Sequence, residues 1–199
     1  GSPMFDSCTF DNNQATNGGG MGVREAGVVL LDCVFNQNTA MNSSGGGAGG
    51  GIRLNDAGAV TVSGCHFIDN VSDIGGGVRF MSNVELATFD ACRFVGNTAR
   101  TGGGIASHNS EVEVTACSFE GNVAEPLDED DPSGGGIRCS GTGNVYVVDS
   151  FFCGNTPDHT DCWYMESDNN QFFDSCELDC DVNEDCLDCN GNDELDFWD

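Results

Sequence analysis

The sequence predicts an all-β solenoid of about six coils, in which short parallel strands stack coil upon coil. The first observation is a phrase of the form Cys-x-Phe-x-x-Asn that occurs six times, with serine in place of cysteine in the last copy. The second is a glycine run followed by an apolar residue, which recurs between the copies. Such a period is typical of a solenoid, because each unit buries its apolar side only against its neighbours. The copies begin at Cys8, Cys33, Cys65, Cys92, Cys117 and Ser150, and the glycine runs lead to Met21, Ile52, Val78, Ile105 and Ile137.

The spacing and composition favour strands over helices. Successive copies are 25, 32, 27, 25 and 33 residues apart, so the basic coil has about 25 residues and two coils carry insertions. A helical hairpin does not fit this length, and the chain has no lysine while 29 of its 199 residues are glycine. Val60 and Val62 alternate with polar residues, as a half-buried strand requires. We therefore expect at least three strands in each coil: the Gly-Gly-Gly-Ile strand, the Val-x-Val strand and the Cys-x-Phe strand.

The apolar alternation slips by one residue between the valine strand and the phenylalanine strand. A slip of one residue would turn a straight strand inside out, so the backbone must bend there. The predicted corners are Ser63-Gly64, Thr115-Ala116 and Val148-Asp149.

Stacking places like residues on like residues about 4.8 Å apart. We expect the phenylalanines to form an interior stack, with the cysteines beside them as small apolar spacers. The asparagine that ends each phrase tolerates the left-handed conformation of a tight turn, and its amide can bond to the amides above and below. These ladders are expected to serve the fold.

The paired phrases Phe-x-x-Asn and Gly-Gly-x-Ile resemble the repeat of the chlamydial polymorphic outer membrane proteins and of other bacterial surface proteins. The resemblance covers about residues 8 to 155. It implies a right-handed parallel β-helix that acts as an extracellular, adhesion-type passenger without an active site of its own. The predicted domains are an N-terminal edge with a cloning remnant (1–7), the parallel β-helix (8–156) and a small, acidic, Cys-rich C-terminal cap (157–199).

A formal charge of −27, with six arginines as the only Lys or Arg residues, excludes nucleic acid as a natural partner and disfavours anionic lipid. No run of 18 apolar residues occurs, so we expect no membrane insertion. The first strands have no cap before them, which predicts further coils before residue 1 and self-association through the N-terminal coil. At the other end, an apolar cluster is expected to cover the last coil: Trp163, Tyr164, Met165, Phe172 and Phe173.

The twelve cysteines fall into two groups. Five occupy the interior ladder and Cys139 an equivalent inward position, so these six are expected to be reduced and buried. The other six lie in polar, loop-like sequence, where a disulfide framework is expected and argues for an exported protein. Cys162 is the nearest candidate partner of Cys153, although six cysteines allow 15 pairings and a zinc site is the alternative. This second group is Cys153, Cys162, Cys176, Cys180, Cys186 and Cys189.

The C-terminal tail has the oxygen-ligand spacing of a twelve-residue calcium loop. It is similar to dockerin-type loops, which implies calcium as the cofactor. The tail departs from that pattern at Asp193, where such loops usually have glycine. A second run of alternating oxygens, from Asp179 to Asp185, fits a solvated linker better. The predicted calcium ligands are Asp188, Asn190, Asn192, Glu194, Asp196 and Asp199.

Two insertions enter the repeat at the same corner, at Thr39 to Ala48 and at Val123 to Ser133. Loops on a rigid scaffold often bind ligands, so this edge is the predicted recognition surface, although corners also tolerate insertions that have no function.

An outward column of arginines, Arg53, Arg79 and Arg138, is interrupted by Ala106. Three glutamates lie on the next face, and isolated ion pairs would explain both sets. The three histidines occupy unrelated positions in the coil, so no catalytic residue is predicted. These groups are Glu85, Glu111 and Glu113, and His66, His108 and His159.

Together these features favour a non-catalytic, extracellular structural or adhesion module of an exported bacterial surface protein, with a surface glycan or a protein as its ligand. The alternative is a carbohydrate-active β-helix enzyme, a polysaccharide lyase or hydrolase, or its glycan-binding relative.

Overall fold

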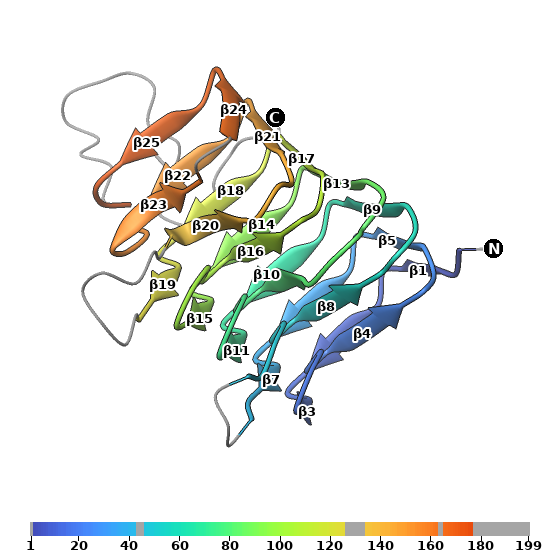
Figure 1. Ribbon diagram of the computed structural model, residues 1–199. Helices are drawn as coiled ribbons and strands as arrows, with labels where there is room; N and C mark the ends of the chain where they lie inside the picture. The colour runs from blue at the N-terminus through green and yellow to red at the C-terminus, as the bar shows by residue number, and fades with distance from the viewer. Residues whose placement is uncertain (1, 43–45, 126–133, 163–164, 177–199) are drawn as a thin grey trace.

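The computed structural model describes residues 2–42, 46–125, 134–162 and 165–176. Its strands form four parallel sheets that run the length of a parallel β-helix. Figure 1 shows the coils stacked along one axis, with the N-terminal coil at one end and β24 and β25 at the other. The predicted fold class is confirmed, and each complete coil has four strands because a short strand follows the phenylalanine strand.

We name the sheets by their contents. The Val sheet contains β1 (Met4–Asp6), β5 (Val28–Leu31), β9 (Val60–Ser63), β13 (Ala87–Asp90), β17 (Val112–Thr115), β21 (Val145–Val148) and β24 (Met165–Asp168). The Phe sheet contains β2 (Thr9–Asp11), β6 (Val34–Asn36), β10 (His66–Ile68), β14 (Arg93–Val95), β18 (Ser118–Glu120), β22 (Phe151–Cys153) and β25 (Gln171–Phe173). The short sheet contains β3 (Gln14–Ala15), β7 (Thr39–Ala40), β11 (Val71–Ser72), β15 (Thr98–Ala99) and β19 (Val123–Ala124). The Arg sheet contains β4 (Met21–Arg24), β8 (Ile52–Asn55), β12 (Val78–Phe80), β16 (Ile105–His108), β20 (Gly134–Ser140) and β23 (Asp158–Asp161).

The predicted interior phenylalanine stack is present and continuous. Successive rings along the Phe sheet are nearly parallel, with centroids 4.6 to 5.0 Å apart. Rings in the middle of the stack are fully buried, whereas Phe172 in the last coil is 46% exposed. The stack consists of Phe10, Phe35, Phe67, Phe94, Phe119, Phe152 and Phe172.

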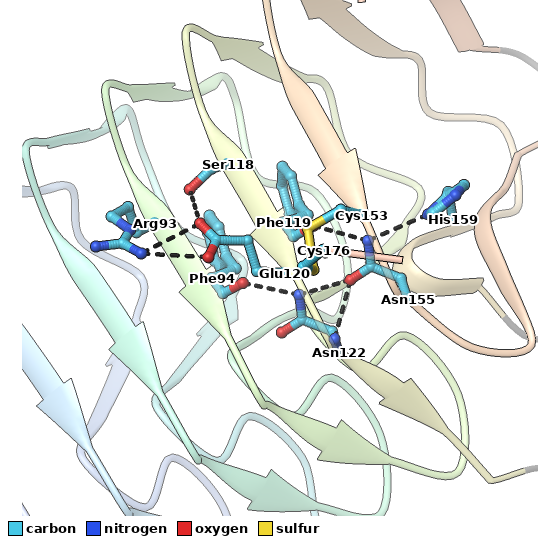
Figure 2. Close-up of a disulfide and its surroundings, with 10 residues drawn as sticks. All are labelled: Arg93, Phe94, Ser118, Phe119, Glu120, Asn122, Cys153, Asn155, His159 and Cys176. Carbon is cyan, nitrogen blue, oxygen red and sulfur yellow. Dashed lines mark hydrogen bonds and ion pairs between the residues drawn. A yellow bond between two sulfur atoms is a disulfide. The ribbon is translucent and has the colours of Figure 1, made fainter. Parts of the chain in front are cut away.

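The asparagine ladder confirms one part of its prediction and corrects the other. Asn122 Nδ2 donates to Asn155 Oδ1 at 2.8 Å, as Figure 2 shows. Equivalent bonds join the asparagines of the earlier coils. The left-handed conformation, however, belongs to the residue before each asparagine, with a φ of 51° at Asp69 and 62° at Gly96. The ladder asparagines are not in that conformation, and their backbone N–H groups donate into the ladder, as Asn97 N does to Asn122 Oδ1.

The three corners between the Val and Phe sheets occur where they were predicted. Gly64, Ala116 and Asp149 have φ values of 63°, 50° and 50°, so a single left-handed residue makes each bend. The glycine runs permit close stacking at another corner. A Cβ on Gly76 would collide with the carbonyl oxygen of Gly103 in the next coil.

Strand pairing extends beyond the predicted bounds of 8–156 at both ends. β1 pairs with β5 from Met4 onward, and β23, β24 and β25 add a further coil that ends at Phe173. Phe172 and Phe173 were expected to cover the last coil, but they lie on a strand that continues it. The open edge of β22 explains this, because its backbone groups gain hydrogen-bond partners only from another strand. Trp163 and Tyr164 lie outside the described residues.

Five ladder thiols, Cys8, Cys33, Cys65, Cys92 and Cys117, are free as predicted, and all but Cys8 are buried. The prediction for Cys139 is wrong, because Cys139 is bonded to Cys162.

Cys153 is bonded to Cys176 and not to Cys162, the nearest candidate among the pairings that the sequence left open (Figure 2). Register accounts for both bonds. Arg138 pairs with Asp161 at the end of the pairing between β20 and β23. The next residues on the two segments are Cys139 and Cys162, which therefore lie side by side. Cys153 pairs with Phe173, three residues before Cys176. Both bonds therefore join the last coil to the one before it.

Candidate functional site

The predicted calcium ligands, Asp188 to Asp199, lie outside the described residues, so calcium binding stays a prediction. Within residues 2–42, 46–125, 134–162 and 165–176, no group of three or more His, Cys, Asp or Glu side chains is arranged to hold a metal ion. The same part of the chain has no helix with the length and apolar character needed to cross a membrane.

Both insertions enter at the predicted corner, between the short sheet and the Arg sheet. Their bounds are shifted, because Thr39–Ala40 and Val123–Ala124 form the regular strands β7 and β19. The first insertion is fastened to the next coil by Asp73, which is buried. Its Oδ2 atom accepts hydrogen bonds from the backbone nitrogens of Gly47 at 2.6 Å and Asn42 at 3.2 Å. Residues 126–133 of the second insertion lie outside the described residues.

The predicted arginine column is present on the outward face of the Arg sheet. Arg53 on β8 pairs in register with Arg79 on β12, which pairs with Ala106 on β16, and Ala106 pairs with Arg138 on β20. Strand spacing therefore places Arg53 and Arg79 about 4.8 Å apart at their backbones, and Arg138 about 10 Å beyond Arg79. Half of the six arginines of the chain lie in this one column.

The arginines outside the column have carboxylate partners. Arg24 pairs with Glu25 at 3.1 Å, Arg93 with Glu120 at 3.2 Å, and Arg100 approaches Asp73 at 4.0 Å. The Arg93 pair also receives a hydrogen bond from Ser118 Oγ to Glu120 Oε1, as Figure 2 shows.

Arg53 and Arg79 form no ion pair or hydrogen bond through their side chains within the part of the chain that the structure describes. Arg79 is only 8% exposed, and its Nε and Nη1 atoms are buried without a hydrogen-bond partner, as is Nε of Arg53. Burial, together with the neighbouring charges of Arg138 and Arg53, lowers the pKa of Arg79 to about 10. The guanidinium nevertheless stays protonated at neutral pH.

A polar column lies beside the arginines on the same face and includes His108 and Ser140, which pair in register. Asn109 Nδ2 can only donate, so His108 Nε2 accepts at 3.0 Å and Nδ1 holds the proton toward Ser140 Oγ, also at 3.0 Å. Burial, then the charges of Arg79 and Arg138, lower the pKa of His108, so the ring is neutral at pH 7. The arginines are thus bordered by uncharged hydrogen-bonding groups.

The three glutamates, His66 and His159 do not join this site, and His108 is the histidine that lies beside it. Glu113 lies on β17 of the Val sheet, and Glu85 and Glu111 lie in the connections that lead into that sheet. His66 lies on β10 of the Phe sheet, and His159 on β23 contacts the ring of Phe152. The unrelated positions predicted for the histidines are confirmed.

A separate depression near the N-terminal coils is lined by three carboxylates from successive coils, Glu25, Asp56 and Glu85. Asn83 Nδ2 donates to Asp56 Oδ1 at its rim, at 3.2 Å. The sequence did not single out this group, because its members occupy connections whose lengths differ from coil to coil.

Comparison with known proteins gives one family. A family model described as the right-handed β-helix region matches residues 4–152. Neither the search of curated proteins nor the search of solved structures found a match.

Proposed function

The chain belongs to the right-handed β-helix family, and we propose that it is a non-catalytic, extracellular binding module of the surface or adhesion type. Two features support export. The fold is compatible with an extracellular protein, and so are two disulfides, because such bonds persist in oxidising compartments. Members of one fold can differ in function, so the binding role must rest on a particular surface.

The observation that carries the binding role is the arginine column on the Arg sheet. In a chain with a formal charge of −27, two adjacent arginines have no carboxylate partner among the described residues. Their face is rigid, because it lies on paired strands, and it borders the corner at which both insertions enter. Rigid faces bordered by loops are where ligands usually bind. The ligand is a surface glycan or a protein.

A glycan-degrading enzyme is the second candidate. The depression lined by Glu25, Asp56 and Glu85 favours it, because glycosidases act through paired carboxylates that flank the scissile bond. Catalysis there would require one carboxyl group to hold a proton while another is ionised.

One experiment separates the two functions. The protein is applied to a glycan array and, in parallel, incubated with the bound glycans in calcium and in EGTA while reducing ends and unsaturated products are measured. Binding without product supports the module. Product that disappears in the Glu85→Gln variant, while the matched surface variant Glu113→Gln retains it, would establish the enzyme instead. Binding that requires calcium would support the predicted tail site.

A further inference from the structure

The pairing of Arg53 with Arg79 is unfavourable for an isolated protein. Two guanidinium groups on adjacent strands repel each other. A buried donor without a partner also loses its hydrogen bonds to water and gains no hydrogen bond in the protein, which costs free energy. The register brings them together, and burial keeps Nε and Nη1 of Arg79 from water. Among the described residues, no carboxylate forms an ion pair with either of them. An anion from outside the chain would offset both penalties.

We propose that Arg53 and Arg79 bind an anionic substituent, a carboxylate or a sulfate, of an extracellular glycan. This inference rests on the proposed function and names its ligand class. Arginine suits both groups, because its planar fork donates two parallel hydrogen bonds to their oxygens. Arg53 is only half-buried, so its guanidinium meets the anion first. Binding to Arg79 requires its guanidinium to turn outward, because Nε and Nη1 are buried in the free protein.

The surroundings of the pair favour a sugar with isolated charges over a dense polyanion. A net charge of −27 repels a ligand with a charge on every unit. The adjacent column holds Asn55, the neutral His108 and Ser140, whose side chains bond within the protein and add no charge beside the arginine pair. The ligand therefore carries single acidic substituents among neutral sugars.

The test measures binding to the full chain by calorimetry with three probes: a neutral oligosaccharide that contains a single uronate residue, the methyl ester of that oligosaccharide, and a neutral oligosaccharide with a single sulfate group. The variants are Arg79→Gln and Arg53→Gln. Arg24→Gln is the matched control, because Arg24 lies on β4 of the same sheet but is exposed and paired with Glu25. We expect each column variant to weaken acidic-probe binding about 10- to 100-fold, the usual range for a charged hydrogen bond, and the control to bind like the wild type. The uronate and sulfate arms identify which anion is preferred.

Several outcomes would overturn the inference. Equal affinity for the uronate and its methyl ester would show that the carboxylate charge does not contribute to binding. An unchanged affinity in both column variants would place the binding site elsewhere and leave the proposed binding function intact. Failure of the wild type to bind any glycan on the array would contradict the proposed glycan-binding function as well. Melting curves of each variant guard against misfolding, and inorganic sulfate should raise the melting temperature of the wild type more than that of Arg79→Gln.

Discussion

Asn97 and Asn122 are joined by two hydrogen bonds that end on one oxygen. Asn97 Nδ2 donates to Asn122 Oδ1 at 2.9 Å, and the backbone nitrogen of Asn97 donates to the same oxygen at 3.1 Å. Asn97 Oδ1 accepts the equivalent pair from Asn70, and its Nδ2 also donates to the carbonyl of Phe67 at 2.8 Å. Every polar atom of this fully buried side chain thus has a partner, which makes the ladder a support for the Phe stack beside it.

Replacing Asn97 with alanine should therefore destabilise the protein by at least about 3 kcal/mol. The substitution removes the acceptor for the backbone N–H and the side-chain Nδ2 of Asn70, and it removes one donor to the carbonyl of Phe67. Each buried hydrogen-bonding group left unsatisfied costs about 1–3 kcal/mol. Urea unfolding measures the loss. Asn36→Ala serves as control, because the Asn36 side chain bonds to the exposed Asp11 and not to a buried group, and a loss as large there would contradict the burial argument.

Replacing Phe94 with alanine should cost about 3–5 kcal/mol. Its ring stacks between Phe67 and Phe119 at 4.7 and 4.6 Å, and the coils above and below prevent collapse into the cavity. Val95→Ala, on the outward side of the same strand, should cost far less. An unchanged melting temperature for Phe94→Ala would mean that the ladder does not support the core.

Stability should fall as the pH rises above about 9. Burial raises the pKa of the Cys65 thiol from its ordinary value of 9.0 to about 12, and burial also raises that of Cys33. The unfolded chain releases these protons near pH 9 while the folded chain keeps them, so the contribution to stability is complete below pH 9 and is lost as the pH approaches the folded value.

Melting curves from pH 7 to pH 10 check the sign of this dependence. Cys65→Ala should show a shallower decline, and a melting temperature that rises with pH would contradict the assignment. Native alkylation should spare Cys33, Cys65, Cys92 and Cys117 while Cys8, which is partly exposed, reacts.

The two disulfides should hold the last coil in place. Each spans 23 residues, and the chain-entropy model gives about 3 kcal/mol for a loop of that size. A Cys153→Ser, Cys176→Ser double variant should lose that much stability and expose β24 and β25 to hydrogen exchange. Peptide mapping under non-reducing conditions should yield Cys139 linked to Cys162 and Cys153 linked to Cys176. Any link between Cys33 and Cys65 would be inconsistent with the free ladder thiols.

The sequence predicted what the repeat controls. The corner at Gly64 was predicted from a shift of one residue in the apolar alternation. The amide ladder was predicted from the constant spacing between Phe and Asn, because equivalent residues of successive coils lie on top of one another. Arg53 and Arg79 were placed in one column for the same reason.

Features outside the period could not be predicted in this way. The bond between Cys139 and Cys162 depends on register in β23, a strand with neither the phenylalanine phrase nor the glycine run. The burial of Arg79 depends on how the column packs, which composition does not encode. Likewise, the last coil was mistaken for a cap because Phe172 has no asparagine three residues later.

The free energy of unfolding of Arg79→Met, measured in urea without ligand, tests most directly the claim that Arg79 is retained for binding. Methionine keeps much of the stem and removes a buried charge that has no partner among the described residues. Replacing even a paired buried charge and its partner by apolar side chains is often neutral or stabilising, so removing this charge should not destabilise the fold. The predicted result is a variant at least as stable as the wild type that no longer binds the acidic probe. A loss of stability on the scale of Phe94→Ala would contradict the claim, because Arg79 would then be part of the fold's support.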